Sequence, residues 1–191
     1  MGLLGTIPLL LVLLVVPGLV LQVFGTEFAE GSTALRILLI GQFVNVAVGS
    51  VGFILIMVGR TGWDLAVYAA SFAIDVGLAL ALAPVFGANG AAAAQSTALV
   101  VANVARLWLV WRFVGIQPFT RWYAKLAIPG AASALVMIAT HLALRKSPWP
   151  VDLLATAALG TIAYLAVLWP TALKPSERAA IGRLVRAARV S

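Results

Sequence analysis

The chain has no cysteine and only one histidine, His141. The lack of cysteine excludes disulfides, thiolate nucleophiles and cysteine-based metal sites, and a single histidine excludes a metal site built from several histidines. Charged residues are also scarce, at 10% of the chain, whereas a soluble domain carries about a quarter. The sequence therefore predicts no metal and no cofactor, and its composition is not that of a soluble domain.

Hydrophobic residues dominate, at 63% of the chain with a mean hydropathy of +1.08. A helix rises about 1.5 Å per residue, so the roughly 30 Å hydrocarbon core of a bilayer needs about 20 residues. For the first apolar segment a signal peptide is the alternative, but the basic start and the cleavage site are lacking. The sequence predicts an all-α integral membrane protein with six transmembrane helices, over residues 3–24, 34–58, 64–86, 90–112, 123–144 and 151–172.

Basic residues outnumber acidic ones, with 13 Lys and Arg against 6 Asp and Glu. On a soluble protein this excess would suggest a nucleic-acid partner, but here the charges lie between apolar segments and indicate membrane topology. Because Lys and Arg are enriched in cytoplasmic loops, we expect both termini in the cytoplasm and the protein in the plasma (inner) membrane. The basic residues predicted on the cytoplasmic side are then Arg60, Arg112, Arg121, Lys125, Lys174, Arg178, Arg183, Arg186 and Arg189.

Residues 174–191 differ from the rest of the chain. At 100° per residue, four arginines gather on one helix face and aliphatic residues gather on the other. This pattern is typical of a basic amphipathic helix that binds the anionic inner leaflet, and a frayed, solvated tail is the alternative. The predicted membrane-binding residues are Arg178, Arg183, Arg186 and Arg189.

Polar residues within membrane spans are costly and usually face the interior of a helix bundle or a water-filled cavity. In the second predicted span, Gln42 and Asn45 share a face with Gly41, Gly49 and Gly52. Packing is the simplest explanation for the glycines, because small residues let helices approach closely.

The third predicted span carries a sharper polar stripe. Asp64, Tyr68, Ser71 and Asp75 follow the spacing i, i+4, i+7, i+11 and so fall on one side of a helix. Asp75 lies near the middle of the span, where a charge costs at least about 2.5 kcal/mol. It is interpreted as a proton or cation site or a substrate contact, with a hydrogen-bonded packing residue as the alternative.

The fourth predicted span places Gln95, Asn103 and Arg106 on one flank. We expect Arg106 to extend to the inner membrane interface, as long basic side chains near helix ends do. Asp75 is then left without a basic partner at its own depth. His141 is predicted to be a surface group near the outer end of the fifth span.

Residues 34–62 (ALRILLIGQFVNVAVGSVGFILIMVGRTG) and 72–119 (FAIDVGLALALAPVFGANGAAAAQSTALVVANVARLWLVWRFVGIQPF) resemble the C-terminal part of polysaccharide flippases. This family transports lipid-linked oligosaccharides and belongs to the superfamily that includes the multidrug antiporters and the lipid II flippase. The most specific match is residues 83–97 (APVFGANGAAAAQST), which are similar to the family's turn of Pro, an aromatic residue and Gly.

The resemblance implies a two-lobed helical bundle in which a lipid-linked glycan passes between the lobes. Residues 1–120 would be four helices of the C-terminal lobe, residues 121–173 two further helices, and residues 174–191 the cytoplasmic tail. A separate N-terminal half or other glycan-assembly proteins would be the partners. Asp75 stands where the family usually has Asn. The head group would be contacted by the polar residues Gln42, Asn45, Tyr68, Ser71, Asp75, Gln95, Asn103 and Arg106.

Other functions remain open. A multidrug or cation antiporter of the same superfamily would use Asp75 as its coupling acid. A membrane scaffold without transport activity is a second alternative, and a membrane glycosyltransferase would need larger polar loops than the sequence predicts. No residue pattern indicates covalent chemistry, so we do not expect an enzyme.

Overall fold

The computed structural model describes residues 2–48, 51–115 and 121–171, with side chains from residue 5 on and, in the last range, from residue 127 on. All regular structure in these ranges is helical, which confirms the all-α prediction for this part of the chain. The elements are α1 (Gly2–Val15), α2 (Pro17–Gln22), the 3₁₀ helix η1 (Thr26–Gly31), α3 (Ser32–Val48), α4 (Val51–Met57), α5 (Thr61–Phe86), α6 (Ala88–Val114), α7 (Arg121–Ala143) and α8 (Trp149–Thr171).

Several predictions concern residues outside the described ranges. They are the tail helix of residues 174–191 with its four arginines, the position of Gly49, and the side chains of Arg121 and Lys125. These stay predictions.

Within the described ranges, four segments are long and apolar enough to cross a membrane. They are Thr26–Val48, which joins η1 to α3, and the helices α5, α6 and α8. They correspond to the second, third, fourth and sixth predicted spans. Shorter apolar helices occupy Gly5–Val15 and Ala127–Ala143, within the first and fifth predicted spans.

The first predicted span is divided into two helices, which corrects its expected boundaries. Residues 3–24 form α1 and α2, because Pro17 begins a new helix two residues after α1 ends at Val15. Proline lacks the N–H that would continue the helical hydrogen bonds, and its fixed φ suits the first residue of a helix. The second predicted span contains α3 and α4, and residues 49–50 between them lie outside the described ranges.

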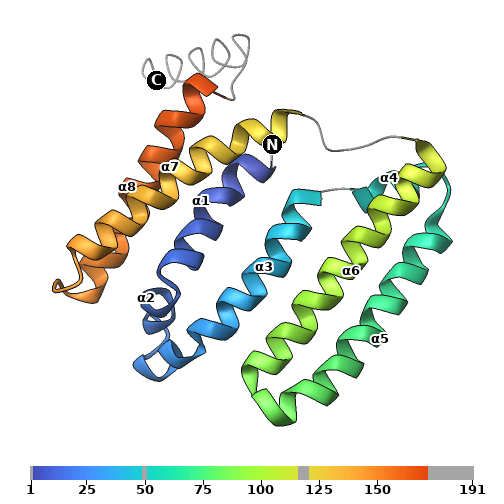
Figure 1. The fold of residues 1–191 in the computed structure, drawn as a ribbon, viewed down its shortest axis with the longest axis horizontal. Helices are drawn as coiled ribbons and strands as arrows, with labels where there is room; N and C mark the ends of the chain where they lie inside the picture. The colour runs from blue at the N-terminus through green and yellow to red at the C-terminus, as the bar shows by residue number, and fades with distance from the viewer. Residues whose placement is uncertain (1, 49–50, 116–120, 172–191) are drawn as a thin grey trace, which may run out of the picture.

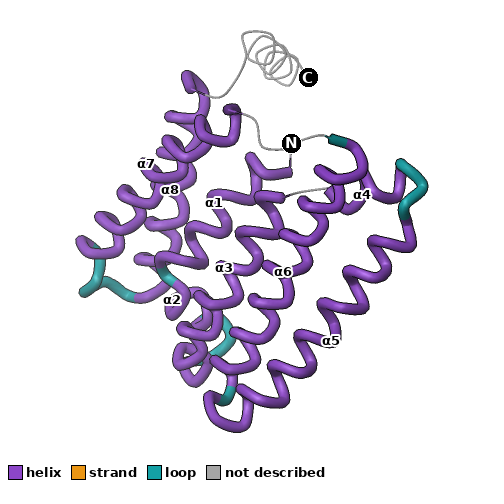
Figure 2. Tube along the Cα trace, turned by 45° about the vertical axis from the view of Figure 1, so that its right-hand side comes forward, coloured by secondary structure: helices purple, strands orange, loops and turns teal. Residues whose placement is uncertain are grey.

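The long helices lie next to one another in a layer (Figure 1). Helix α6 packs between α3 and α5, α3 packs on α1, and α1 contacts the α7–α8 hairpin. Figure 2 shows the short loops that join neighbouring helices at the two ends of the layer. Because α6 is central, its side chains reach both α3 and α5.

Small residues bring the central helices close together. A Cβ at Gly90 would overlap the main chain of Leu82, so glycine is required where α6 begins beside the end of α5. A Cβ at Gly41 would lie 2.8 Å from the Cα of Ser96, whose hydroxyl donates a hydrogen bond to the Ile37 carbonyl. Gly41 therefore has the packing role expected of it.

The α7–α8 hairpin packs on α1, at the end of the layer opposite α5. The Ser133 hydroxyl donates a hydrogen bond to the Gly160 carbonyl at 2.7 Å. The buried Met137 side chain occupies the space that a Cβ at Gly160 would need. Met137 also packs with Val12 and Val16, which joins this hairpin to α1.

Candidate functional site

The layer formed by α3, α6 and α5 has one polar and one apolar side. On the apolar side, a cavity between α5 and α6 is lined by Trp63, Val101 and Trp108, among other mostly apolar residues. On the other side, two cavities are lined by polar side chains from the three helices. We call this second side the polar face; its residues are Gln42, Asn45, Tyr68, Ser71, Asp75, Gln95, Asn103 and Arg106.

The first polar cavity, of about 270 Å³, lies between α5 and α6. Asp75 and Gln95 face it from the two helices, together with Tyr68, Ser71 and Phe72. Asp75 is half-buried, and within the described part of the chain none of the ion pairs includes it. The expectation that Asp75 has no basic partner therefore agrees with its surroundings.

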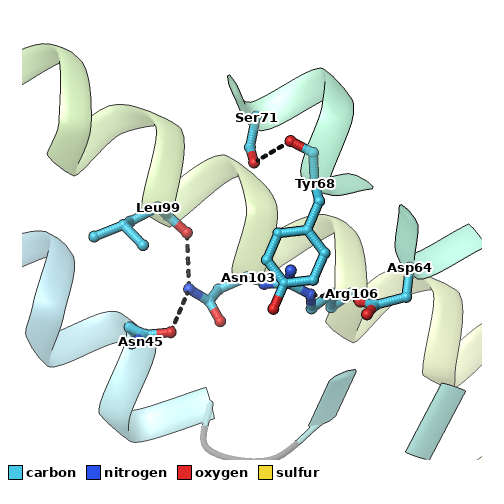
Figure 3. A network of polar contacts seen from close by, with 7 residues as sticks. All are labelled: Asn45, Asp64, Tyr68, Ser71, Leu99, Asn103 and Arg106. Atoms are coloured by element: carbon cyan, nitrogen blue, oxygen red, sulfur yellow. Dashed lines mark hydrogen bonds and ion pairs between the residues drawn. The ribbon is translucent and has the colours of Figure 1, made fainter. Parts of the chain in front are cut away.

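The second polar cavity, of about 190 Å³, lies between α3, α4, α5 and α6. Its most buried member is Asn103. The Asn103 amide donates hydrogen bonds to the Leu99 carbonyl at 2.8 Å and to the Asn45 Oδ1 at 3.3 Å (Figure 3). This pair of amides connects the polar residues of α3 to those of α6.

Arg106 lies between the two cavities and lines both. Its Nε donates to the Asp64 Oδ1 at 2.9 Å, and the two side chains are only 9% and 10% exposed. Its guanidinium carbon lies 4.1 Å from the centre of the Tyr68 ring, in a cation–π contact (Figure 3). Arg106 is therefore buried inside the helix layer, held by an aromatic ring and by a carboxylate from the first turn of α5. Its position relative to the membrane interface stays a prediction.

The charge pair is tightly enclosed. A Cβ at Gly52 of α4 would lie 3.4 Å from both the Arg106 Nε and the Asp64 Oδ1. The Arg106 Nη2 is buried and has no hydrogen-bond partner among the residues that the structure describes. Leaving such a donor unsatisfied costs about 1–3 kcal/mol. Arg106 thus keeps spare donor capacity at the point where the two polar cavities meet.

Asp64 is the residue whose importance was missed, although it belonged to the predicted polar stripe. The sequence feature that could have predicted its pairing with Arg106 is the register of the α5–α6 hairpin, whose turn is at Gly87. Arg106 and Tyr68 are equally distant from Gly87 along the chain, so they face each other, and Asp64 lies one helical turn further on. The same register places Asp75 too close to the turn to reach Arg106.

Gln42 is the polar-face residue that lies outside both polar cavities. It is exposed on α3 and lines neither polar cavity. It directly follows Gly41, which packs against Ser96, so it lies at the level of Gln95 on α6. The structure thus places seven of the eight predicted residues around two adjoining cavities, with Gln42 beside them.

A second polar cluster lies in the α7–α8 hairpin, away from the polar face. The His141 Nδ1 is 2.8 Å from the Asp152 Oδ2, and the Thr156 hydroxyl donates to the Asp152 Oδ1 at 3.1 Å. The His141 side chain is 30% exposed, whereas that of Asp152 is 4% exposed. His141 is thus partly exposed, as a surface group would be, but it also pairs with the buried Asp152, a contact that the sequence analysis did not predict.

No protein-family model, curated protein or solved structure matches the chain.

The chemistry of the polar face indicates which kind of solute it could bind. Amides and hydroxyls both donate and accept hydrogen bonds, and a guanidinium group binds anionic oxygens well. Such a surface suits a solute that has many hydroxyl groups and a negative charge. The carboxylate of Asp75 would instead suit a proton or a cation.

Proposed function

We propose that the chain is the C-terminal portion of a transporter that moves lipid-linked oligosaccharides across the plasma membrane. The polar face would line the path of the glycan head group. The observation that carries this proposal is the gathering of polar residues from three helices around two adjoining cavities. The resemblance of residues 34–62 and 72–119 to polysaccharide flippases points in the same direction.

The proposal includes six membrane spans with both termini in the cytoplasm. In addition to the four long apolar segments, the first span would be formed by α1 with α2, and the fifth by α7. The asymmetric distribution of Lys and Arg supports this orientation. The tail arginines would then lie beside the anionic inner leaflet.

A glycan head group that enters the membrane must exchange its hydrogen bonds with water for bonds with the protein. The exposed amides of Gln42 and Gln95 and the exposed Tyr68 side chain are suitable partners for sugar hydroxyls. Arg106 would attract the phosphate oxygens of the lipid carrier, because charge-assisted bonds to guanidinium are the stronger ones. The buried Asp64 beside it would keep this attraction moderate and so allow release.

The lipid part of the substrate requires an apolar surface. A cavity of about 290 Å³ between α1 and α3 is lined by aliphatic side chains and Phe43. The residues that α3 contributes to it lie on the same helix as Gln42 and Asn45 but face α1. Helix α3 would thus separate the head-group path from a surface that suits an isoprenoid or acyl chain.

The test is binding and translocation of a lipid-linked oligosaccharide by the purified chain. We expect the chain in detergent to bind a polyprenyl-pyrophosphate oligosaccharide more tightly than the same carrier without sugar. In vesicles with a fluorescent head group, an impermeant quencher would report faster exchange between leaflets than in protein-free vesicles. Gln95→Leu should weaken both effects. Thr97→Val is the matched control, because Thr97 is also exposed but faces away from Gln95.

Equal binding of the sugar-free carrier, together with unchanged exchange between leaflets, would contradict the proposal. Binding alone would assign the polar face to substrate recognition and leave translocation dependent on a second half. The two readouts therefore separate recognition from transport.

One observation favours a cation antiporter as the second candidate. Asp75 shares its cavity with Phe72 and Tyr68, and a carboxylate beside aromatic rings is suited to organic cations. For this function, a pH gradient should drive the uptake of a fluorescent organic cation, and Asp75→Asn should abolish it. The lipid-linked oligosaccharide should then neither bind nor compete.

A further inference from the structure

The apolar side of the layer has a groove between α5 and α6, with a volume of about 240 Å³. Four of its lining residues are alanines, whose small side chains leave the space free. Trp63 and Trp108 also line it and are 48% and 57% exposed. From Trp63 to Ser71 the groove follows α5 for about 12 Å. A groove of this character, on helices apolar enough to span a membrane, suits part of an acyl chain.

Two arginines lie at the end of this groove, where the α5–α6 hairpin is furthest from its turn (Figure 1). Arg60 directly precedes α5, and its guanidinium carbon is 4.6 Å from the centre of the Phe113 ring. The centres of the Phe113 and Trp63 rings are 5.7 Å apart, which places Arg60 beside the groove. Arg112 follows Trp108 by four residues and therefore lies on the same side of α6, one turn beyond the groove.

The positive charge at this end of the groove is not compensated within the described part of the chain. Arg60 and Arg112 are both exposed, and none of the ion pairs among the described residues includes either of them. The carboxylate in the first turn of α5 is that of Asp64, and it is paired with Arg106 inside the layer. Both exposed guanidinium groups can therefore bind an anion from outside the chain.

We propose that the groove and its two arginines bind an anionic phospholipid. One acyl chain lies between α5 and α6, and the phosphate lies at the guanidinium groups of Arg60 and Arg112. Guanidinium donors match phosphate oxygens well, and such bonds are charge-assisted. Tryptophans favour the level of the lipid head groups, which is where this arrangement places Trp63. A zwitterionic head group carries its own cation, so it is bound less tightly.

The combination of groove and charge favours a lipid over other occupants. The apolar groove and the basic end follow one another along the helix axes, as the chain and head group of a membrane lipid do. A soluble anion would use the arginines and leave the groove empty. An apolar partner helix would fill the groove and leave both arginines uncompensated. Arg60 and Arg112 also belong to the side predicted to be cytoplasmic, where anionic lipids are concentrated.

This inference rests on the membrane location of the chain and not on transport. The groove is on the apolar side of the layer, whereas the proposed head-group path follows the polar face. Loss of transport with intact lipid binding would contradict the proposed function alone. Transport without preference for an anionic lipid would contradict this inference alone.

Native mass spectrometry of the delipidated chain in detergent measures the binding of single lipids. We expect phosphatidylglycerol to bind more tightly than phosphatidylcholine with the same acyl chains. Arg60→Gln and Arg112→Gln should each weaken phosphatidylglycerol about fivefold, as expected for one basic residue beside an anionic lipid. Binding of phosphatidylcholine should be unchanged in both variants.

Arg36→Gln is the matched control for the loss of one positive charge. Arg36 is exposed and lies in the second turn of α3. Contacts of Gly41 with Ser96 and of Asn45 with Asn103 show that α3 and α6 run in the same direction. Arg36 is therefore at the opposite end of the layer from the groove arginines, and its loss should not weaken phosphatidylglycerol.

A second pair of variants tests the position of the acyl chain. Ala70 lines the groove and is exposed, so Ala70→Phe should fill the space and weaken both lipids. Ala69→Phe is the control, because Ala69 is exposed but does not line the groove. Inorganic phosphate should not displace phosphatidylglycerol, because it lacks the chain. All the substituted side chains are exposed, so folding should be unaffected, and helical circular dichroism checks this.

Four results would overturn the proposal. The first is equal affinity for the two lipids, and the second is equal weakening by Arg36→Gln and by the groove arginine variants. The third is unchanged lipid binding in Ala70→Phe, which would place the chain elsewhere. The fourth is displacement of the lipid by inorganic phosphate, which would indicate a site for free anions.

Discussion

Removal of one member of the Asp64–Arg106 pair is expected to destabilise the protein more than removal of both. The two side chains are 10% and 9% exposed, so solvent screens their interaction only weakly. Removal of one partner from a buried pair leaves an uncompensated charge and costs about 3–5 kcal/mol. Replacement of both by apolar residues of similar size is often neutral, because two desolvation penalties disappear together.

The structure also predicts an order among the single variants. In Asp64→Leu, the guanidinium group keeps its contact with the Tyr68 ring, at 4.1 Å, and such a contact contributes about 0.5–2 kcal/mol. In Arg106→Met, the buried carboxylate loses its partner and Tyr68 loses the cation. Arg106→Met should therefore be the more destabilising single change, and the double variant should be more stable than either.

Unfolding in mixed micelles of a mild detergent and dodecyl sulfate, followed by helical circular dichroism, measures these differences. Arg112→Met is the control, because Arg112 lies in the last turn of the same helix but is exposed, and its loss should change stability by less than about 0.5 kcal/mol. The reasoning is refuted if the Arg106 variant behaves like this control. It is also refuted if the double variant loses the sum of the two single losses.

Four further outcomes are expected. Gly90→Ala should destabilise the protein by about 1–3 kcal/mol in the same assay, because its Cβ would overlap the main chain of α5. A substitution at the next residue, Ala91, which is exposed, should have little effect. Asp75→Asn should abolish gradient-driven transport in a complete transporter that carries this segment and leave membrane insertion intact, whereas full activity over a range of pH would assign Asp75 to packing. With an impermeant thiol reagent outside the cell, Ser32→Cys should react and Ser191→Cys should not, and the reverse result would invert the topology. A peptide of residues 174–191 should bind anionic vesicles and dissociate as salt rises, and equal binding to neutral vesicles would exclude an electrostatic contribution.

The helical class and the polar face could be predicted because both depend on periodicity within one helix. Polar residues three, four and seven positions apart share a side of any α-helix, whatever its neighbours. The stripe that ends at Asp75 therefore lies on one side of α5, as expected. The gathering of three stripes on one side of the layer depends on how α3, α5 and α6 pack, and no single helix contains that information.

Side-chain partners were harder to predict, because they depend on which of two competing interactions is stronger. Arg106 could reach the interface or pair with Asp64, and both options satisfy its charge. The register of the α5–α6 hairpin favours the pair, since it places the Asp64 Oδ1 at 2.9 Å from the Arg106 Nε. His141 illustrates the same limit: its partner Asp152 lies on the next helix, and only the geometry of the α7–α8 hairpin brings the two groups together.

The two carboxylates of α5 show how one helix can provide different chemistry at different depths. Asp64 is compensated by Arg106 and enclosed by Gly52, so exchange of a ligand or a proton there would require the pair to separate. Asp75, three turns further along the same side, faces a cavity together with an amide and two aromatic residues, and none of the ion pairs of the described residues includes it. Asp64 is therefore suited to hold the helices together and orient Arg106, whereas Asp75 is the carboxylate that a solute in the cavity would meet.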